Sequence, residues 1–126
     1  MIAADTSTWI ALLEGDPGQD AELLKQALTD RLVLMVPAVL TELLSGPVLS
    51  YSVAETLSEI PMIEVETGYW QRAGLLRAKV LSARRKARLG DALIAQTCID
   101  SGIRLLTRDK DFRAFADAAE LNLLVL

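Results

Sequence analysis

The chain has 126 residues with a net charge of −4, and it contains no histidine. Its length suits a single domain with one sizeable hydrophobic core, and we expect that domain to span residues 1–126. Without histidine there is no Ser-His-Asp triad, no Cys-His pair and no Cys/His metal cluster. An enzyme with this composition works with carboxylates, amines, hydroxyls or a bound metal ion.

Short apolar segments alternate with helical patterns along the sequence. The expected strands cover residues 2–4, 32–36, 62–65, 104–107 and 123–126. The expected helices cover residues 8–13, 19–29, 38–44, 52–58, 68–88, 91–101 and 111–116. The strand segments are mostly apolar, as parallel strands buried on both faces are. This alternation predicts an α/β domain with a parallel sheet and right-handed crossovers.

The longest expected helix, over residues 68–88, combines an apolar stripe with many basic residues. The stripe consists of Leu75, Leu76, Val80 and Leu81. A solvated helix face normally mixes both charge signs, yet this stretch has no acid. We interpret it as a rim that binds phosphates, the alternative being an ordinary exposed helix end. Its basic residues are Arg72, Arg77, Lys79, Arg84, Arg85, Lys86 and Arg88.

Hydropathy and cysteine content bear on location and partners. No apolar run approaches the roughly 18 residues that a membrane helix needs, and residues 1–5 lack the positive segment of a signal peptide. We therefore expect a cytoplasmic protein without membrane association. The mean hydropathy of +0.31 suggests that a partner or a second copy covers some apolar surface. The single Cys98 excludes an intramolecular disulfide, and we interpret it as a small core residue.

Acidic residues follow the carboxyl ends of the expected strands, which is where sites form in open α/β sheets. They are Asp5, Glu42, Asp109 and Asp111. Asp91 begins the helix that leads into the fourth strand, so it reaches the same edge only if that helix packs obliquely. Taken singly, each acid also has an ordinary interpretation as a helix cap, a turn residue or a solvated side chain.

Taken together, the acids favour a metal site. Several carboxylates at one place repel each other, and some take up protons unless a cation lies between them. Oxygen ligands without histidine or cysteine favour Mg²⁺ or Mn²⁺. Such an ion lowers the pKa of a bound water and stabilises the charges of a phosphodiester during its cleavage.

Four motifs in chain order carry a resemblance to a known family. They are MIAADTS at residues 1–7, VPAVLTEL at 36–43, DALIA at 91–95 and LLTRDKDF at 105–112. Each is weak alone, but all four in this order are specific and span nearly the whole chain. The sequence resembles the PIN-domain ribonucleases, most closely the VapC-type toxins of type II toxin–antitoxin pairs.

The resemblance implies a three-layer α/β/α sandwich with a parallel sheet of about five strands, and a metal-dependent endoribonuclease that uses Mg²⁺ or Mn²⁺. Carried over by motif, the catalytic carboxylates are Asp5, Glu42, Asp91 and Asp109. The metal ligands are Asp5, Asp91, Asp109 and Asp111, with Asp111 the alternative to Asp109 as the fourth carboxylate. Supporting hydroxyls come from Thr6, Ser7 and Thr107. The RNA-binding residues are Arg84, Arg85, Lys86, Arg88, Arg108 and Lys110.

The resemblance also implies partners, namely RNA, a VapB-like antitoxin and a second copy in a homodimer. By analogy, helices near residues 52–58 and 68–80 contribute to the dimer surface. The alternatives are a non-catalytic PIN-like module that binds RNA or protein, and an RNA-processing nuclease that is not a toxin. A receiver-like signalling domain fits poorly, because Glu64 to Thr67 lacks its phosphoacceptor aspartate. A haloacid-dehalogenase-type phosphatase would need an aspartate where Ser7 stands.

Overall fold

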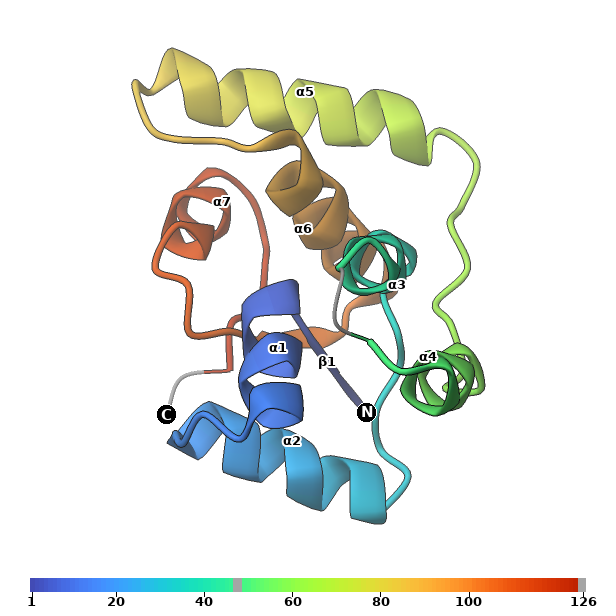
Figure 1. Ribbon diagram of the computed structural model, residues 1–126. Helices are drawn as coiled ribbons and strands as arrows, with labels where there is room; N and C mark the ends of the chain where they lie inside the picture. Colours follow the sequence, from blue (N-terminus) through green and yellow to red (C-terminus); the bar gives the residue numbers. More distant parts are fainter. Residues whose placement is uncertain (47–48, 125–126) are drawn as a thin grey trace.

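Two short parallel strands lie between layers of helices in the computed structural model, which describes residues 1–46 and 49–124 (Figure 1). Strand β1 (Ile2–Ala4) pairs with β2 (Arg104–Leu106), with Ile2 opposite Arg104 and Ala4 opposite Leu106. Five of these six residues are buried, which explains why the sequence is apolar there. Both strands predicted at these positions are confirmed.

Three further segments join this pair through isolated parallel bridges. Val33 bridges to Ile2, Met35 bridges to Met62, and Leu123 bridges to Leu105. The spatial order is therefore the segment at 62, the segment at 33–35, β1, β2 and the segment at 123. All five predicted strand segments lie in this parallel array, although only β1 and β2 are strands among the described residues. Residues 125–126 of the last predicted strand lie outside them.

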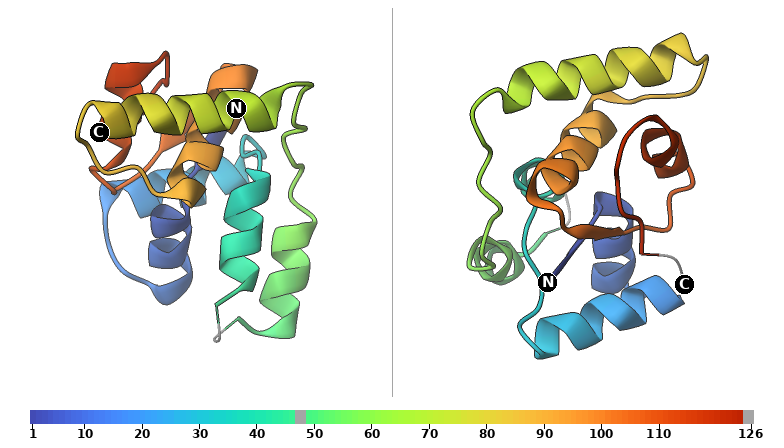
Figure 2. Two further views of the ribbon diagram at one scale, coloured as in Figure 1. Left: turned by 90° about the horizontal axis from the view of Figure 1, so that it is seen from above. Right: turned by 180° about the vertical axis from the view of Figure 1, so that it is seen from behind.

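Seven helices occur in the described part of the chain. They are α1 (Thr6–Glu14), α2 (Gln19–Thr29), α3 (Pro37–Leu44), α4 (Tyr51–Ser58), α5 (Tyr69–Ser82), α6 (Leu89–Ser101) and α7 (Phe112–Ala118). Helices α1 and α2 pack together, as do α5 and α6, and α7 contacts both of the latter. In Figure 1, α2 lies on one side of the strands and α5, α6 and α7 lie on the other, which confirms the predicted α/β/α layers. Helices α3 and α4 lie side by side (Figure 2).

The core between these layers is mostly aliphatic, in keeping with an aromatic content of only 5%. Leu24, Met35, Leu105 and Phe115 are fully buried. Cys98 is also buried within this core, which confirms its interpretation as a small core residue. No helix in the described ranges is long and apolar enough to cross a membrane.

The helix predicted over residues 68–88 ends six residues early, at Ser82. Arg84 has a φ of 60°, in the left-handed region, which turns the chain out of the helix. The basic residues from Arg84 to Arg88 therefore lie in a loop rather than on a helix. The predicted stripe is also half wrong: Leu76 and Val80 are buried, whereas Leu75 and Leu81 are exposed.

Candidate metal centre

Asp5 follows β1 directly and begins α1. Its carboxylate accepts hydrogen bonds from the backbone N–H of Thr8 at 3.1 Å and from the Ser7 hydroxyl at 2.8 and 2.9 Å. The cap interpretation of Asp5 is therefore correct. The residue is only 3% exposed, and this burial raises its pKa, while hydrogen bonds from Thr107, Ser7 and Thr8 partly oppose the rise.

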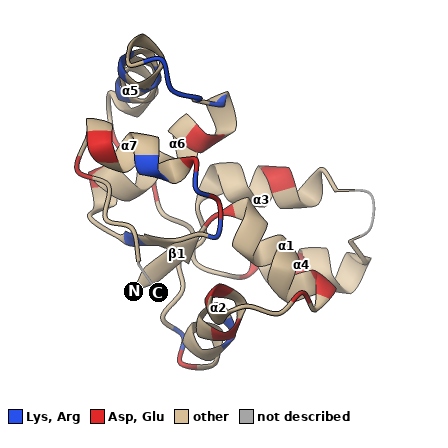
Figure 3. Cartoon of the chain, turned by 90° about the vertical axis from the view of Figure 1, so that its left-hand side faces the viewer, with Lys and Arg blue, Asp and Glu red and all other residues tan. Residues whose placement is uncertain are grey.

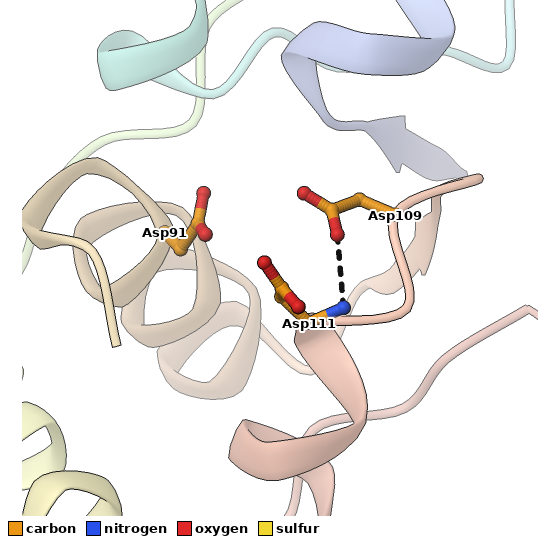
Figure 4. Close-up of side chains that lie close together, drawn as sticks. All are labelled: Asp91, Asp109 and Asp111. Atoms are coloured by element: carbon orange, nitrogen blue, oxygen red, sulfur yellow. Dashed lines mark hydrogen bonds between the residues drawn. The ribbon is translucent and has the colours of Figure 1, made fainter. Parts of the chain in front are cut away.

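Asp91, Asp109 and Asp111 lie together beyond the end of β2 (Figure 4). One carboxylate oxygen of each lies within 4.8 Å of those of the other two. Asp91 comes from the first turn of α6, which begins two residues earlier than predicted, at Leu89. The other two come from the turn after β2, so the structure brings together acids that are about 20 residues apart in sequence.

The turn that carries Asp109 and Asp111 is stabilised by its own side chains. The backbone N–H of Asp109 donates to the Thr107 hydroxyl at 2.9 Å, and that of Asp111 donates to Asp109 Oδ1 at 2.9 Å. The turn interpretation of these residues is therefore correct as well. With the turn held in this way, Asp109 Oδ2 and the Asp111 carboxylate face Asp91 (Figure 4).

The charges of the neighbouring acids act on Asp91. Its pKa is raised to about 6, first by burial and then by the negative charge of Asp109, while Arg88 opposes the rise. Glu42 and Asp5 raise it further, so both lie near enough to act on it. Within the described ranges, Asp91 Oδ2 is buried without a hydrogen-bond partner. A divalent cation would satisfy such an oxygen and offset the repulsion between the carboxylates.

Glu42 lies on α3 at the exposed rim of the group. The Thr6 hydroxyl donates to Glu42 Oε1 at 2.7 Å. On the other side, a side chain at Gly90 would have its Cβ 3.2 Å from Glu42 Oε2. The glycine before Asp91 thus allows the start of α6 to approach Glu42 closely. The predicted supporting hydroxyls of Thr6, Ser7 and Thr107 each bond a residue of the acidic group.

The donor set of this site consists of carboxylate and hydroxyl oxygens, which suits Mg²⁺ or Mn²⁺. Asp91, Asp109 and Asp111 offer converging oxygens, and Asp5 and Glu42 border them. The geometry fits a divalent cation, while the roles of individual residues remain predictions.

Basic residues border the acids on the side of the loop between α5 and α6 (Figure 3). Lys86 Nζ lies 3.3 Å from Asp111 Oδ2. The loop is held on both sides of Lys86, because Arg85 pairs with Asp117 and the Ala87 carbonyl accepts from Arg77 Nε at 2.8 Å. Four of the predicted RNA-binding residues thus lie along this loop, namely Arg84, Arg85, Lys86 and Arg88.

The other two predicted RNA-binding residues, Arg108 and Lys110, stand in the turn after β2. Lys110 lines a cavity of about 380 Å³ together with Arg113 and Gln19. Arg108 lines the same cavity, and its guanidinium group is bonded to Asp16 and Asp20 near the start of α2. Sequence reasoning missed Asp20, because nothing in its local pattern indicates a partner 88 residues away.

Comparison with known proteins agrees with this architecture. The family model described as "PIN domain" matches residues 2–118. VapBC-1 from nontypeable Haemophilus influenzae has a TM-score of 0.75 at 22% identity, covering 98% of this chain and 97% of that one. VapBC2 from Rickettsia felis, solved with a promoter DNA fragment, has a TM-score of 0.74 at 20% identity, covering 98% of both chains. A search of curated proteins gave no match.

Proposed function

The chain belongs to the PIN domain family, and from this premise we propose that it is a metal-dependent endoribonuclease, the VapC-type toxin of a toxin–antitoxin pair. The observation that carries the proposal is the buried, unpartnered Asp91 Oδ2 within reach of Asp109 and Asp111 in the described structure. The VapBC complexes of similar fold support the choice of a toxin.

The acidic residues have distinct tasks in the proposed reaction. Asp91, Asp109 and Asp111, whose oxygens converge, would hold the ion together with Asp5, which borders them. A bound Mg²⁺ or Mn²⁺ would supply acidification of a water and charge stabilisation at the phosphate. Glu42 is exposed and oriented by Thr6, so it is the carboxylate best suited to accept the proton of the attacking water.

An acidic pocket alone would repel RNA, so the basic border is part of the proposal. Lys86 is within 3.3 Å of Asp111, and Arg84, Arg85 and Arg88 flank it in the same loop. These charges would attract RNA phosphates and guide one of them to the acids. Lys110 would contribute from the turn after β2.

Two protein partners belong to the proposal. An apolar groove of about 340 Å³, lined by Ile10, Leu13, Leu43 and Val53, adjoins Glu42 and suits a VapB-like antitoxin segment. On α5, Trp70 and Leu75 are 66% and 72% exposed. Such apolar exposure suits the predicted homodimer.

The direct test is cleavage of total cellular RNA by the purified protein with Mg²⁺ or Mn²⁺ and with EDTA. We expect discrete fragments that require the metal and that Asp5→Asn abolishes, since an amide is a poor ligand for a hard cation. The fold should survive, because Asn can still cap α1. Asp30→Asn, at the exposed end of α2, is the matched control and should cleave normally. Full activity of Asp5→Asn would exclude the site assignment.

The same variant separates the toxin from the competing functions. Expression of a toxin should arrest growth, and Asp5→Asn should relieve the arrest. Metal-dependent cleavage without growth arrest would indicate an RNA-processing nuclease. RNA binding without cleavage by a folded, metal-supplemented protein would indicate a non-catalytic module.

A further inference from the structure

Arg108 stands between Thr107 and Asp109, yet its guanidinium group is bonded to residues at and just before the start of α2. Its Nε and Nη2 atoms each bond one carboxylate oxygen of Asp20 at 2.8 Å. Its Nη1 atom bonds Asp16 at 2.8 Å, and Nη2 also contacts the Pro17 carbonyl at 3.4 Å. Arginine has five N–H donors, and this arrangement uses four hydrogen bonds to hold the turn after β2 against the start of α2.

Asp20 connects this turn to the first turn of α1. Its side chain is only 9% exposed, and the same Oδ2 that accepts from Arg108 accepts from the buried Thr8 hydroxyl at 2.9 Å. The backbone N–H of Thr8 in turn donates to Asp5 at 3.1 Å. A continuous chain of hydrogen bonds therefore joins the Asp109 turn to Asp5, two parts of the site that lie about 100 residues apart.

Gly18 gives independent evidence that this contact is closely fitted. A Cβ atom at this position would lie 2.6 Å from Asp20 Oδ1 and 2.7 Å from Arg108 Nη2. Any side chain would therefore push into the ion pair. The sequence has the one residue type here that leaves room for the pair.

We infer that Arg108 is a positioning residue: through Asp20 it fixes the Thr107–Asp111 turn relative to Asp5, and so sets the spacing of the carboxylates that take the metal. The inference rests on the proposed use of a divalent cation. It replaces the predicted role of Arg108 as an RNA contact, because RNA would have to displace the bonds to Asp20 and Asp16.

The test measures Mn²⁺ binding by the purified protein. The electron paramagnetic resonance signal of free Mn²⁺ reports how much of the ion is unbound, so the measurement needs no RNA. In Arg108→Lys and Asp20→Asn we expect the half-saturating Mn²⁺ concentration to rise about tenfold or more, as for other residues that orient metal ligands. Lysine keeps the charge of Arg108 but cannot make the two-pronged contact with Asp20. At saturating Mn²⁺, the KM for RNA and its salt dependence should stay unchanged.

Arg72 provides a matched control. It forms a similar two-pronged pair with Asp100, at 3.1 and 2.7 Å, near the other end of α6. Arg72→Lys should lower stability by a similar amount and leave Mn²⁺ binding unchanged. Gly18→Ala is a second probe, because it disturbs the Arg108 pair without removing a charge, and it should weaken Mn²⁺ binding as well.

Three results would overturn the inference. The first is unchanged Mn²⁺ binding in Arg108→Lys, and the second is an equal loss of Mn²⁺ binding in Arg72→Lys. The third is a salt slope of RNA binding that falls by about one in Arg108→Gln, because such a fall marks a lost phosphate contact. Mn²⁺ binding by a wild-type protein that cleaves no RNA would contradict the proposed function alone. A wild-type protein without Mn²⁺ binding would contradict both.

Discussion

At the scale of single residues, Asp91 makes stability depend on pH. Its pKa of about 6 in the folded protein exceeds the ordinary value of 3.8. Between these values the folded protein holds more protons at this site than the unfolded chain. The contribution of Asp91 to stability is therefore full below about pH 4 and is lost as the pH rises through 6.

We predict that metal-free wild-type protein loses more stability than Asp91→Asn between pH 5 and pH 7.5, because asparagine does not ionise. Denaturant unfolding in EDTA at both pH values measures the difference. Titrating groups that do not act on Asp91, such as Asp20 and Asp100, are common to both proteins and cancel in the comparison. Equal pH dependence in the two proteins would mean that burial and Asp109 do not perturb Asp91.

Residue types and motifs predicted the acids and the hydroxyls that bond them, but not the more distant support at Asp20. Asp5, Asp91 and Asp109 stand in motifs, and Asp5 and Asp109 also follow strand ends. The local pattern could not decide whether Asp109 or Asp111 is the fourth carboxylate. In the structure both face Asp91. Asp20 was missed entirely, since its partner Arg108 is brought to it only by the tertiary fold.

At the scale of elements, the end of α5 decides where the basic border lies. Propensity favours a helix through residue 88, but Arg84 adopts a φ of 60°. The buried Ala87, whose carbonyl accepts from Arg77, holds the returning chain against α5. Tertiary contacts thus override the local helical pattern, and local patterns do not contain such contacts.

We predict that Arg84→Gly raises the free energy of unfolding by up to about 1 kcal/mol, because glycine adopts this conformation without strain. The same change should weaken RNA binding and lower its salt slope by about one, because a charge of the border is lost. Arg31, with a φ of 56° after α2, is the matched control. Arg31→Gly should give the same gain in stability with unchanged RNA binding. If the two variants bind RNA equally well, Arg84 does not belong to the basic border.

At the scale of the whole molecule, alternation of segments was enough to predict the layers but not the extent of the sheet. Only β1 and β2 form a continuous ladder in the described residues, and the outer segments contribute single bridges. Pro61 immediately precedes the bridge at Met62 and has no N–H to extend a ladder. Apolar patterns mark burial in such segments, and they do not determine how many ladder bonds form.

The exposed apolar side of α5 leads to a prediction about assembly. Leu75→Lys adds a charge at a residue that is 72% exposed, so it should convert a homodimer to a monomer with little loss of monomer stability. Light scattering after size-exclusion chromatography measures the mass. Leu32→Lys, at an exposed leucine after α2, is the control and should leave the dimer intact. A dimer that survives Leu75→Lys would place the interface elsewhere.

The central claim is that these acids bind a divalent metal and cleave RNA with it. Its most direct test is RNA cleavage as a function of Mn²⁺ concentration by wild-type protein and Asp91→Asn, with Mn²⁺ binding measured on the same samples. We predict saturable, EDTA-sensitive cleavage by the wild type, and loss of both binding and cleavage in a folded Asp91→Asn protein. Cleavage that continues in EDTA, or in Asp91→Asn, would contradict the account.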